Sequence, residues 1–411
     1  MTKEYSSKIE ILEQFEKKVR DNLFQNILPF WLNYSIDKEN GGFFGRISND
    51  LQCDKNAPKS LILISRILWT FSALYQFEPN DQYLEIANRA YNYLKDHLID
   101  DQYGGAYWLV DTNGLVIDNM KKMYGQAFLI YSLSEYYSVV GETSILERAI
   151  DTFHLIENHN YDKEFGGYFE VSNRDWSIAE DMRLSAVDMN EKKSMNTHLH
   201  LVEAYTNLYR NWKNDHVRDQ LRKLIDNFID YIIDPETYHF KLFMDEKWQP
   251  KSEGVSYGHD IEGSWLLCEA VQVLNDDNYY QKVNNISVKM TDTVIREALS
   301  NEGAVFLEKD GAGKILKDII YWWPQSEAVV GFLNTFQLRG DLKYLNLANR
   351  AWQYIEKYLV DRQNGEWFYE VSSTGQPNPN RLKVSEWKGP YHNTRACLEI
   401  LKRIEAIRQK A

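Results

Sequence analysis

The chain has 411 residues and a formal net charge of -13, with Asp and Glu interspersed among Lys and Arg throughout. An acidic, mixed surface of this kind excludes proteins that bind nucleic acid or anionic membranes. There is no apolar leader and no run of about 18 apolar residues, and the three cysteines, Cys53, Cys268 and Cys397, are odd in number and widely separated. We therefore predict a cytoplasmic protein with neither a membrane nor a nucleic-acid partner.

One short pattern recurs along the chain, in which Asp, Asn and Gly turn residues precede an aromatic tail. DKENGGFF and DKEFGGYF are two clear copies, and ETYHFKLF is a degenerate one. The six copies occupy residues 37–44, 100–108, 162–169, 236–243, 300–306 and 361–368. Their spacing of about 62 residues, stretching to about 70 at the degenerate copy, indicates a sixfold repeat with a short hairpin or loop in each unit.

Between these loops, apolar residues recur with a period near 3.6, which is typical of helices. We predict helices at 61–76, 82–98, 124–140, 144–157, 197–212, 218–232, 261–275, 278–298, 325–338, 342–359 and 392–408. Two helices per repeat predict an all-α fold, an (α/α)6 barrel of six helical hairpins with short β-hairpin or loop insertions at one face. The eight strands of a TIM barrel are missing. We expect residues 1–411 to form a single catalytic domain.

The repeat also predicts where a site should lie. After each loop comes the more apolar helix of the pair, which we interpret as the inner one. Residues near its start should point into the mouth of the barrel. Candidates recur at this position: Arg66, Tyr124, Asn196, His200, His259, Glu262, Trp322, Trp323 and His392.

Two histidines are the main candidates for proton transfer. His259 and Glu262 share one face of a helix, where a carboxylate orients an imidazole and raises its basicity. His392 follows Gly389-Pro390 at the start of another apolar helix. Imidazoles with pKa values near neutrality suit proton abstraction on one side and donation on the other. The alternative for His259 and Glu262 is an ordinary surface pair.

Other residues suit a sugar ligand. Arg66 is a lone charge in an apolar helix, so it is either a structural ion pair or a group that stabilises negative charge on a sugar oxygen. The chain holds 12 Trp, 27 Tyr and 18 Phe, and such rings stack on sugars as well as fill cores. Trp322, Trp323 and Trp387 are interpreted as a stacking platform at the rim, with core packing as the alternative.

A metal site is not expected. In SMNTHLH at 194–200, His198 and His200 lie about 200 degrees apart on a helix and cannot bind one ion. Zinc-binding spacings are absent, so we interpret His198 as structural, while Asn196 shares a face with His200. Motifs for a nucleophile or a dinucleotide are also missing. A glycosidase pair of carboxylates remains open, with Glu262 and Asp188 as the nearest candidates.

Together these motifs resemble the cellobiose 2-epimerases of the N-acylglucosamine 2-epimerase superfamily. They stand in order as Arg66, Tyr124, SMNTHLH (194–200), GHDIEGSWLL (258–267), YWWPQSEA (321–328) and WKGPYH (387–392). The resemblance implies an (α/α)6 barrel and reversible inversion at C2 of a reducing-end sugar without a cofactor.

The resemblance also implies a role for each residue. His259 and His392 are the acid and base at C2, with a cis-enediolate between the two steps. Arg66 stabilises that intermediate and His200 assists ring opening and closing. Glu262, Tyr124 and Asn196 surround them with hydrogen bonds, and Trp322 and Trp387 stack on sugar rings.

The segment at 173–194 has room to cover the mouth, which favours a cellobiose-type β-1,4-linked disaccharide, epimerised from glucose to mannose at its reducing end. The alternatives are a D-mannose or N-acylglucosamine 2-epimerase acting on a monosaccharide. From other classes, a glycoside hydrolase on the same barrel or a carbohydrate-binding protein without activity is possible, although the two histidines weigh against both. The only expected partner is a small-molecule sugar, and we expect a monomer.

Overall fold

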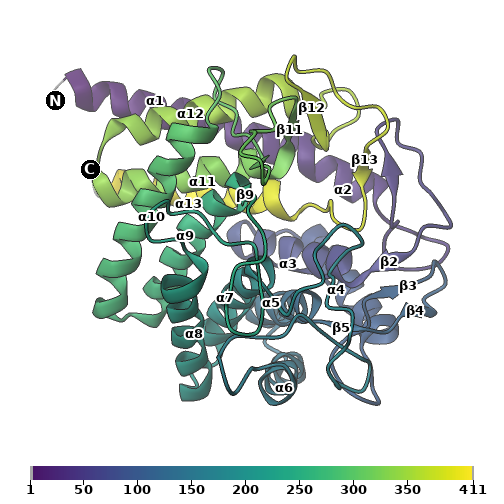
Figure 1. The fold of residues 1–411 in the computed structure, drawn as a ribbon. Coiled ribbons are helices and arrows are strands. Elements are labelled where there is room, and N and C mark those ends of the chain that lie inside the picture. The colour runs from purple at the N-terminus through teal and green to yellow at the C-terminus, as the bar shows by residue number, and fades with distance from the viewer. Residues whose placement is uncertain (1–2, 410–411) are drawn as a thin grey trace.

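Six helices form a closed inner ring in the computed structural model, which describes residues 3–409 (Figure 1). They are α3 (Leu61–Phe77), α5 (Met123–Val140), α7 (Met195–Asn211), α9 (Tyr257–Leu274), α11 (Trp322–Arg339) and α13 (Tyr391–Gln409). Each packs against the next in this order, and α13 packs against α3. The ring therefore closes on itself.

A second ring of helices surrounds the first. It consists of α1-η1-α2 (Lys3–Asn22, Leu23–Ile27, Leu28–Tyr34), α4-η2 (Asp81–Tyr93, Leu94–Leu98), α6 (Thr143–His159), α8-η3 (Asp215–Asn227, Phe228–Ile232), α10 (Asp277–Ala298) and α12-η4 (Leu342–Tyr354, Ile355–Leu359), where η marks a π-helical turn. Each outer helix packs on an inner one, and α1 packs on α13. The predicted (α/α)6 barrel is confirmed.

The outer helix at the N-terminal side is absent from the set predicted by periodicity. Its buried residues Leu12, Phe15, Val19, Leu23 and Ile27 follow a regular three- and four-residue spacing. Mostly polar and charged residues fill the positions between them, so the apolar stripe is narrow. The signal was present and could have predicted this helix.

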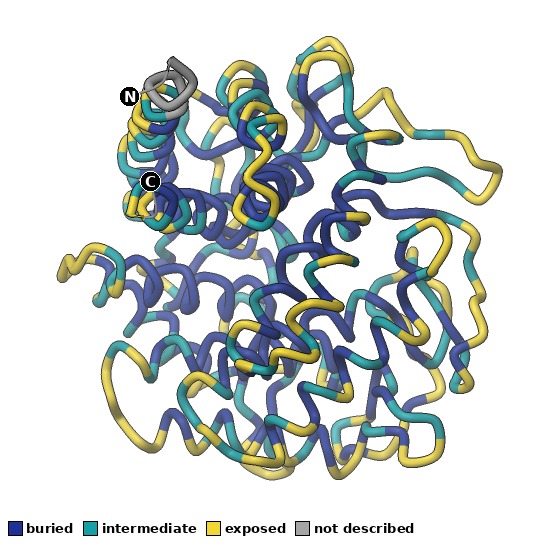
Figure 2. The backbone as a smooth tube through the Cα atoms, turned by 90° about the vertical axis from the view of Figure 1, so that its left-hand side faces the viewer, coloured by how far each residue is buried: buried dark blue, intermediate teal, exposed yellow. Residues whose placement is uncertain are grey.

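Composition decides which helix lies inside. All residues of α3 from Leu61 to Leu74 are buried, because this helix is covered on every side. Of α8, by contrast, only one stripe is buried, including Val217, Leu221 and Leu224. Figure 2 shows buried backbone in the interior and exposed backbone at the peripheral loops. Within residues 3–409, no helix is long and apolar enough to cross a lipid bilayer.

Short strands form a collar around one end of the barrel. They are β1 (Ile47–Ser48), β2 (Lys59–Ser60), β3 (Leu109–Val110), β4 (Val116–Asp118), β5 (Lys121–Lys122), β6 (Val171–Ser172), β7 (Lys193–Ser194), β8 (Phe243–Met244), β9 (Val255–Ser256), β10 (Glu308–Lys309), β11 (Ile319–Tyr321), β12 (Glu370–Ser372) and β13 (Leu382–Val384). The strand that leads into each inner helix pairs antiparallel with a strand of the next repeat, and β13 pairs with β1. The collar therefore closes with the helical ring.

Buried ion pairs fasten the recurring loops to this collar. In four repeats the first Asp of the loop accepts backbone N–H groups and pairs with a buried lysine on the strand before the inner helix. The pairs are Asp37–Lys59, Asp100–Lys121, Asp162–Lys193 and Asp361–Lys383, at 2.6–3.0 Å. Each lysine also donates to a glycine carbonyl of the same loop. The loop pattern in the sequence predicted a short hairpin or loop in each unit but not these ion pairs.

We expect Lys59→Ala to lower the free energy of unfolding by about 3–5 kcal/mol, because it leaves the Asp37 carboxylate buried without its partner. Lys55→Ala is a matched control, since Lys55 pairs at 2.9 Å with Glu39 of the same loop but both side chains are more than 60% exposed. That change should leave the free energy of unfolding nearly unchanged, because solvent screens an exposed pair. Urea denaturation of both variants measures the difference, and equal losses would contradict the structural role of the buried pair.

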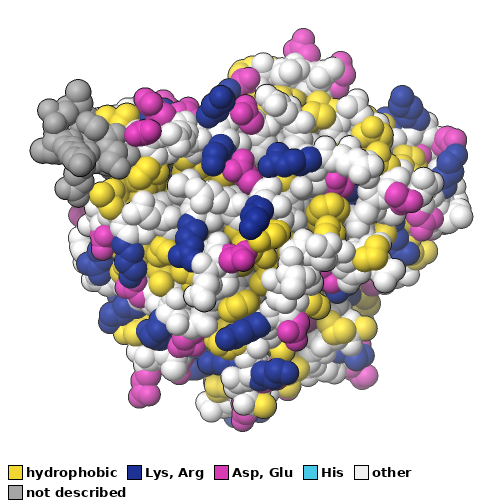
Figure 3. Space-filling model, turned by 90° about the horizontal axis from the view of Figure 1, so that it is seen from above, with side chains coloured by type: hydrophobic (Ala, Val, Ile, Leu, Met, Phe, Trp, Pro, Cys, Tyr) yellow, Lys and Arg dark blue, Asp and Glu magenta, His cyan; other side chains and the backbone are white. Residues whose placement is uncertain are grey.

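The outer surface carries mixed charge. On the face seen from above, Lys and Arg side chains alternate with Asp and Glu (Figure 3). No single sign dominates this face, as the interspersed sequence pattern predicts.

Candidate active site

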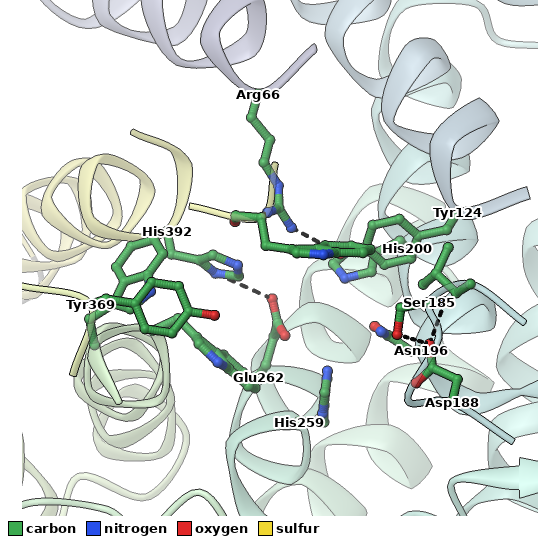
Figure 4. A pocket seen from close by; sticks show the side chains of 14 residues that line it. Arg66, Tyr124, Ser185, Asp188, Asn196, His200, His259, Glu262, Tyr369 and His392 are labelled. Atoms are coloured by element: carbon green, nitrogen blue, oxygen red, sulfur yellow. Dashed lines mark hydrogen bonds and ion pairs between the residues drawn. The ribbon is translucent and has the colours of Figure 1, made fainter. Parts of the chain in front are cut away.

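A cavity of about 230 Å³ opens at the collar end of the barrel. It is lined by all eleven residues that the sequence singled out, Arg66, Tyr124, Asp188, Asn196, His200, His259, Glu262, Trp322, Trp323, Trp387 and His392, and by Leu184, Ser185 and Tyr369. Figure 4 shows these side chains converging from several inner helices and from the loop that carries Ser185 and Asp188.

The inner helices begin at this cavity. Tyr124, Asn196 and His392 are the second residues of α5, α7 and α13, and His259 is the third of α9. Helix N-termini carry partial positive charge and free N–H groups. Five inner helices, α5, α7, α9, α11 and α13, contribute first-turn residues to the cavity, which favours an anionic ligand and disfavours protonated imidazoles.

His392 is held by a carboxylate from a neighbouring helix. Its Nδ1 lies 2.7 Å from Glu327 Oε1 of α11 and 3.9 Å from Glu262 Oε1 of α9. A carboxylate only accepts, so Nδ1 carries the proton and Nε2 is left with a lone pair. Burial, Arg66 and Arg395 together hold the pKa of His392 well below its usual range, although Glu262 opposes them. A neutral His392 can therefore accept a proton at Nε2.

His259 has a different partner. Its Nδ1 lies 2.7 Å from the hydroxyl of Ser256, which can donate or accept. Its ring lies 4.8 Å from that of Trp323. Burial lowers the pKa of His259 to about 4, with Glu262 opposing the shift and His200 adding to it. The expectation that both imidazoles titrate near neutrality is wrong, because both are desolvated.

His200 and His198 have separate environments. His200 Nδ1 lies 2.9 Å from Glu203 Oε2, and its ring lies 4.7 Å from that of Tyr124 in the cavity wall. His198 is fully buried, contacts the carbonyl of Ser194 and accepts from the backbone N–H of Tyr168. Its predicted structural role is confirmed.

Arg395 of α13 links the carboxylates beneath the cavity. One guanidinium nitrogen donates to Glu262 Oε1 at 2.6 Å and to Glu327 Oε1 at 2.8 Å, and the other donates to Glu203 and to the hydroxyl of Tyr391. Among the described residues, one trio of metal-ligand type comes together, Glu262, Glu327 and His392. Because the Oε1 atoms of both carboxylates are already bound by the Arg395 guanidinium, and that of Glu327 also by His392 Nδ1, this trio does not resemble a metal site.

Arg66 is the cation that faces the cavity. It donates to the carbonyl of Trp387 at 2.7 Å and to the hydroxyl of Tyr124 at 2.9 Å, and its guanidinium lies 4.6 Å from the ring of Phe128. Within residues 3–409, no carboxylate lies at ion-pair distance from it. The structural ion pair considered for Arg66 is therefore not formed, and its charge is left for an anionic ligand.

The aromatic residues differ in exposure. Trp322 is only 2% exposed and packs edge-on against His392, so it belongs largely to the core. Trp323 and Trp387 are partly exposed in the cavity wall. The rim platform expected from the sequence therefore consists of Trp323 and Trp387, with the partly exposed Tyr369 beside them.

Two polar groups are available to sugar hydroxyls. Asn196 Oδ1 is buried and has no hydrogen-bond partner, so it is a free acceptor in the cavity wall. Asp188 uses Oδ2 to hold the backbone N–H and hydroxyl of Ser185 at 2.8 and 2.7 Å. This turn fixes part of the 173–194 segment at the mouth.

Sequence reasoning missed Glu203 and Glu327, the carboxylates that orient His200 and His392. Glu203 stands three residues after His200, the same spacing that drew attention to Glu262 beside His259. Glu327 lies within a noted motif but meets His392 only through the packing of α11 on α13. The role of Glu203 could therefore have been predicted from the sequence, whereas that of Glu327 could not.

Known proteins resemble this chain in sequence and in structure. A family model described as N-acylglucosamine 2-epimerase matches residues 42–396. The cellobiose 2-epimerase of Bacteroides fragilis is 42% identical over 392 residues, which are 95% of this chain and 99% of that one. The structure of cellobiose 2-epimerase from Bacillus thermoamylovorans B4167 matches with a TM-score of 0.90 at 38% identity, covering 95% of this chain and 100% of that one. The D-mannose isomerase of Marinomonas mediterranea is 22% identical, covering 92% of this chain and 95% of its own. The chain thus belongs to the N-acylglucosamine 2-epimerase family, a family of isomerases.

Proposed function

We propose that the protein, acting as one catalytic barrel over residues 1–411, is a cofactor-independent sugar 2-epimerase. It interconverts glucose and mannose at the reducing end of cellobiose-type β-1,4-linked disaccharides. The observation that carries the proposal is the pair of imidazoles, His259 from α9 and His392 from α13, that reach one cavity beside the unpaired guanidinium of Arg66.

The chemistry follows from the substrate. The hydrogen on C2 becomes acidic only when the ring opens and C1 becomes a carbonyl, so ring opening comes first. His200, whose Nδ1–H faces Glu203, has its other ring nitrogen free to assist that step. One histidine then removes the C2 proton, and the other returns a proton to the opposite face.

The intermediate is a cis-enediolate, and its negative charge must be stabilised. Arg66 supplies a fixed positive charge whose position is set by Trp387 and Tyr124. The converging helix N-termini add to this field. Glu262 lies between the two histidines, where one oxygen is held by Arg395 and the other is available to a sugar hydroxyl.

Two observations support a disaccharide. The relative named cellobiose 2-epimerase is 42% identical, whereas the one named D-mannose isomerase is 22% identical. The 173–194 segment adds Leu184, Ser185 and Asp188 to the cavity wall, beyond the inner helices. Trp387 and Tyr369 offer aromatic faces for a second ring.

The test is NMR of the purified protein in D2O with cellobiose, D-mannose or N-acetylglucosamine in separate tubes. Deuterium at C2 together with the 2-epimer of cellobiose is the expected result. Reaction of only a monosaccharide would replace the substrate assignment. Glucose release without exchange at C2 would indicate a hydrolase and overturn the proposal.

We expect kcat/KM for cellobiose to change less than about twofold between pH 8 and pH 5.5. A base is active while neutral, and His259, with its pKa lowered to about 4, stays neutral until the pH falls towards that value. A histidine with an ordinary pKa near 6.5 would lose about 90% of its neutral form by pH 5.5. A pH–rate profile checks this, and an acidic limb centred between pH 6 and 7 would contradict it.

A further inference from the structure

A second cavity, of about 210 Å³, adjoins the first. Leu184, Asp188, Asn196 and His259 line both cavities. Ser256 and Glu308 line the second cavity only. His259 therefore stands in a wall between two spaces, with one ring nitrogen bound to a residue of the second.

Ser256 departs from the behaviour of serines at the same place in other repeats. Ser60 and Ser194 are the N-cap residues of α3 and α7, and each hydroxyl accepts the backbone N–H of the third helical residue at 3.1 Å. Ser256 is the N-cap residue of α9, but its hydroxyl makes no capping bond. It contacts His259 Nδ1 instead. The helix gives up a stabilising N-cap bond.

The nature of the partner distinguishes His259 from the other two histidines of the cavity. His200 and His392 face carboxylates, which hold the proton on Nδ1. A hydroxyl can donate to Nδ1 as well as accept from it, so His259 can carry its proton on either nitrogen. Of these three imidazoles, His259 alone can present Nε2–H to a substrate while remaining neutral.

Resting on the proposed epimerase function, we propose that Ser256 is a positioning residue that lets neutral His259 act as the proton donor at C2. As the Nε2–H bond breaks and a C–H bond forms at C2, the Ser256 hydroxyl proton passes to Nδ1. In the same step the Ser256 oxygen takes a proton from a solvent molecule, so that no free alkoxide forms, and the proton that His392 later releases to solvent restores the balance. In the reverse reaction each transfer runs backwards, and His392 exchanges its own proton with solvent after the product leaves.

The surroundings fit this relay. Glu308 stands on β10 directly opposite Ser256 of β9, and both line the second cavity. Burial raises the pKa of Glu308, and Asp310 adds to the shift, so its carboxyl group takes up protons more readily than an exposed one. The lowered pKa of His259 makes its imidazolium scarce at neutral pH, so a donor that never becomes fully charged has an advantage.

The test compares Ser256→Ala, Ser256→Thr and Ser60→Ala in the full chain with cellobiose. At pH 7.5, Ser256→Ala should lower kcat roughly tenfold or more with little change in KM, because Ser256 does not line the first cavity. Ser256→Thr, which keeps the hydroxyl, should retain kcat within about threefold. Ser60→Ala should lower the melting temperature without this loss of kcat, because the Ser60 hydroxyl caps α3 and otherwise makes only a long contact of 3.4 Å to the carbonyl of Glu386.

The pH profile separates a relay from a structural role. Without the hydroxyl, His259 can donate only as an imidazolium, so kcat of Ser256→Ala should rise as the pH falls from 8 to 6, while kcat of the unmodified protein stays nearly constant. A kcat equal to that of the unmodified protein would overturn the relay, as would a lowered kcat with an unchanged pH profile. If the unmodified protein does not epimerise cellobiose, D-mannose or N-acetylglucosamine, the proposed function itself fails.

Discussion

Replacing His259 or His392 by alanine is expected to reduce epimerisation by about 10²- to 10⁴-fold while leaving the protein folded. Each variant keeps one of the two histidines, and therefore one of the two proton transfers. Slow exchange of the C2 hydrogen with solvent should survive for only one epimer in each variant, and the two variants should choose opposite epimers. Proton NMR in D2O, started from cellobiose and from its 2-epimer, measures both quantities.

His154→Ala is the matched control, because this histidine is exposed on the outer helix α6 and should change nothing. Activity like that of the unmodified protein in either site variant would remove that histidine from the mechanism. Exchange of the same epimer in both variants would show that the two imidazoles approach C2 from one face. Circular dichroism confirms that loss of activity is not loss of fold.

Replacing Arg395 by methionine is expected to lower the free energy of unfolding by about 3–5 kcal/mol and to abolish epimerisation. The change leaves Glu203, Glu262 and Glu327 buried without their shared cation. It also releases the two carboxylates that orient His200 and His392. Urea denaturation at pH 7 and an epimerisation assay measure the two effects.

The loss of stability should shrink as the pH is lowered from 7 towards 4.5. Burial alone would raise the pKa of Glu203, but Arg395 and His200 hold it at about 2. Stability from this group is therefore complete above the unfolded pKa near 4.5 and is lost only as the pH falls towards 2. In the variant the unpaired carboxylates take up protons on folding, so acid stabilises it. A loss that does not change with pH would contradict this account.

Arg20→Ala is the control for this experiment. Arg20 forms a short ion pair with Glu78 at 2.6 Å, but the two side chains are 40% and 51% exposed. Solvent screens such a pair, so its removal should cost less than about 1 kcal/mol.

The sequence predicted the barrel because its signals are local and repeated. Loops with Asp and Gly mark each unit, and the strongly apolar helix of each pair is the one that lies inside. Their position within each repeat predicted that Tyr124, Asn196, His259 and His392 lie near the starts of inner helices. In the structure these residues line one cavity. A position repeated six times is informative even when no single copy is.

What could not be predicted depends on contacts between distant residues. Arg395 meets acids from α7, α9 and α11, and no spacing in the sequence links them. The same limit explains the error about histidine pKa values. Desolvation depends on what packs against an imidazole, and the rings of His259 and His392 pack against Trp323 and Trp322 of α11, respectively. The sequence also could not show that Trp322 is buried and Trp323 partly exposed, because the two residues are adjacent and share the same local pattern.

The closure of the inner ring by α13 against α3 constrains the order in which the protein can assemble on the ribosome. Five inner helices, α3 to α11, emerge before α13 and bring Glu203, Glu262 and Glu327 with them, but their cation arrives only with Arg395. Until then, the five inner helices form an open arc. Its three acids lack their cation, and the apolar surface that α13 later covers is exposed. Stable closure should therefore be a late event that follows release of α13 from the exit tunnel, and the arc before it is the stage most in need of a chaperone.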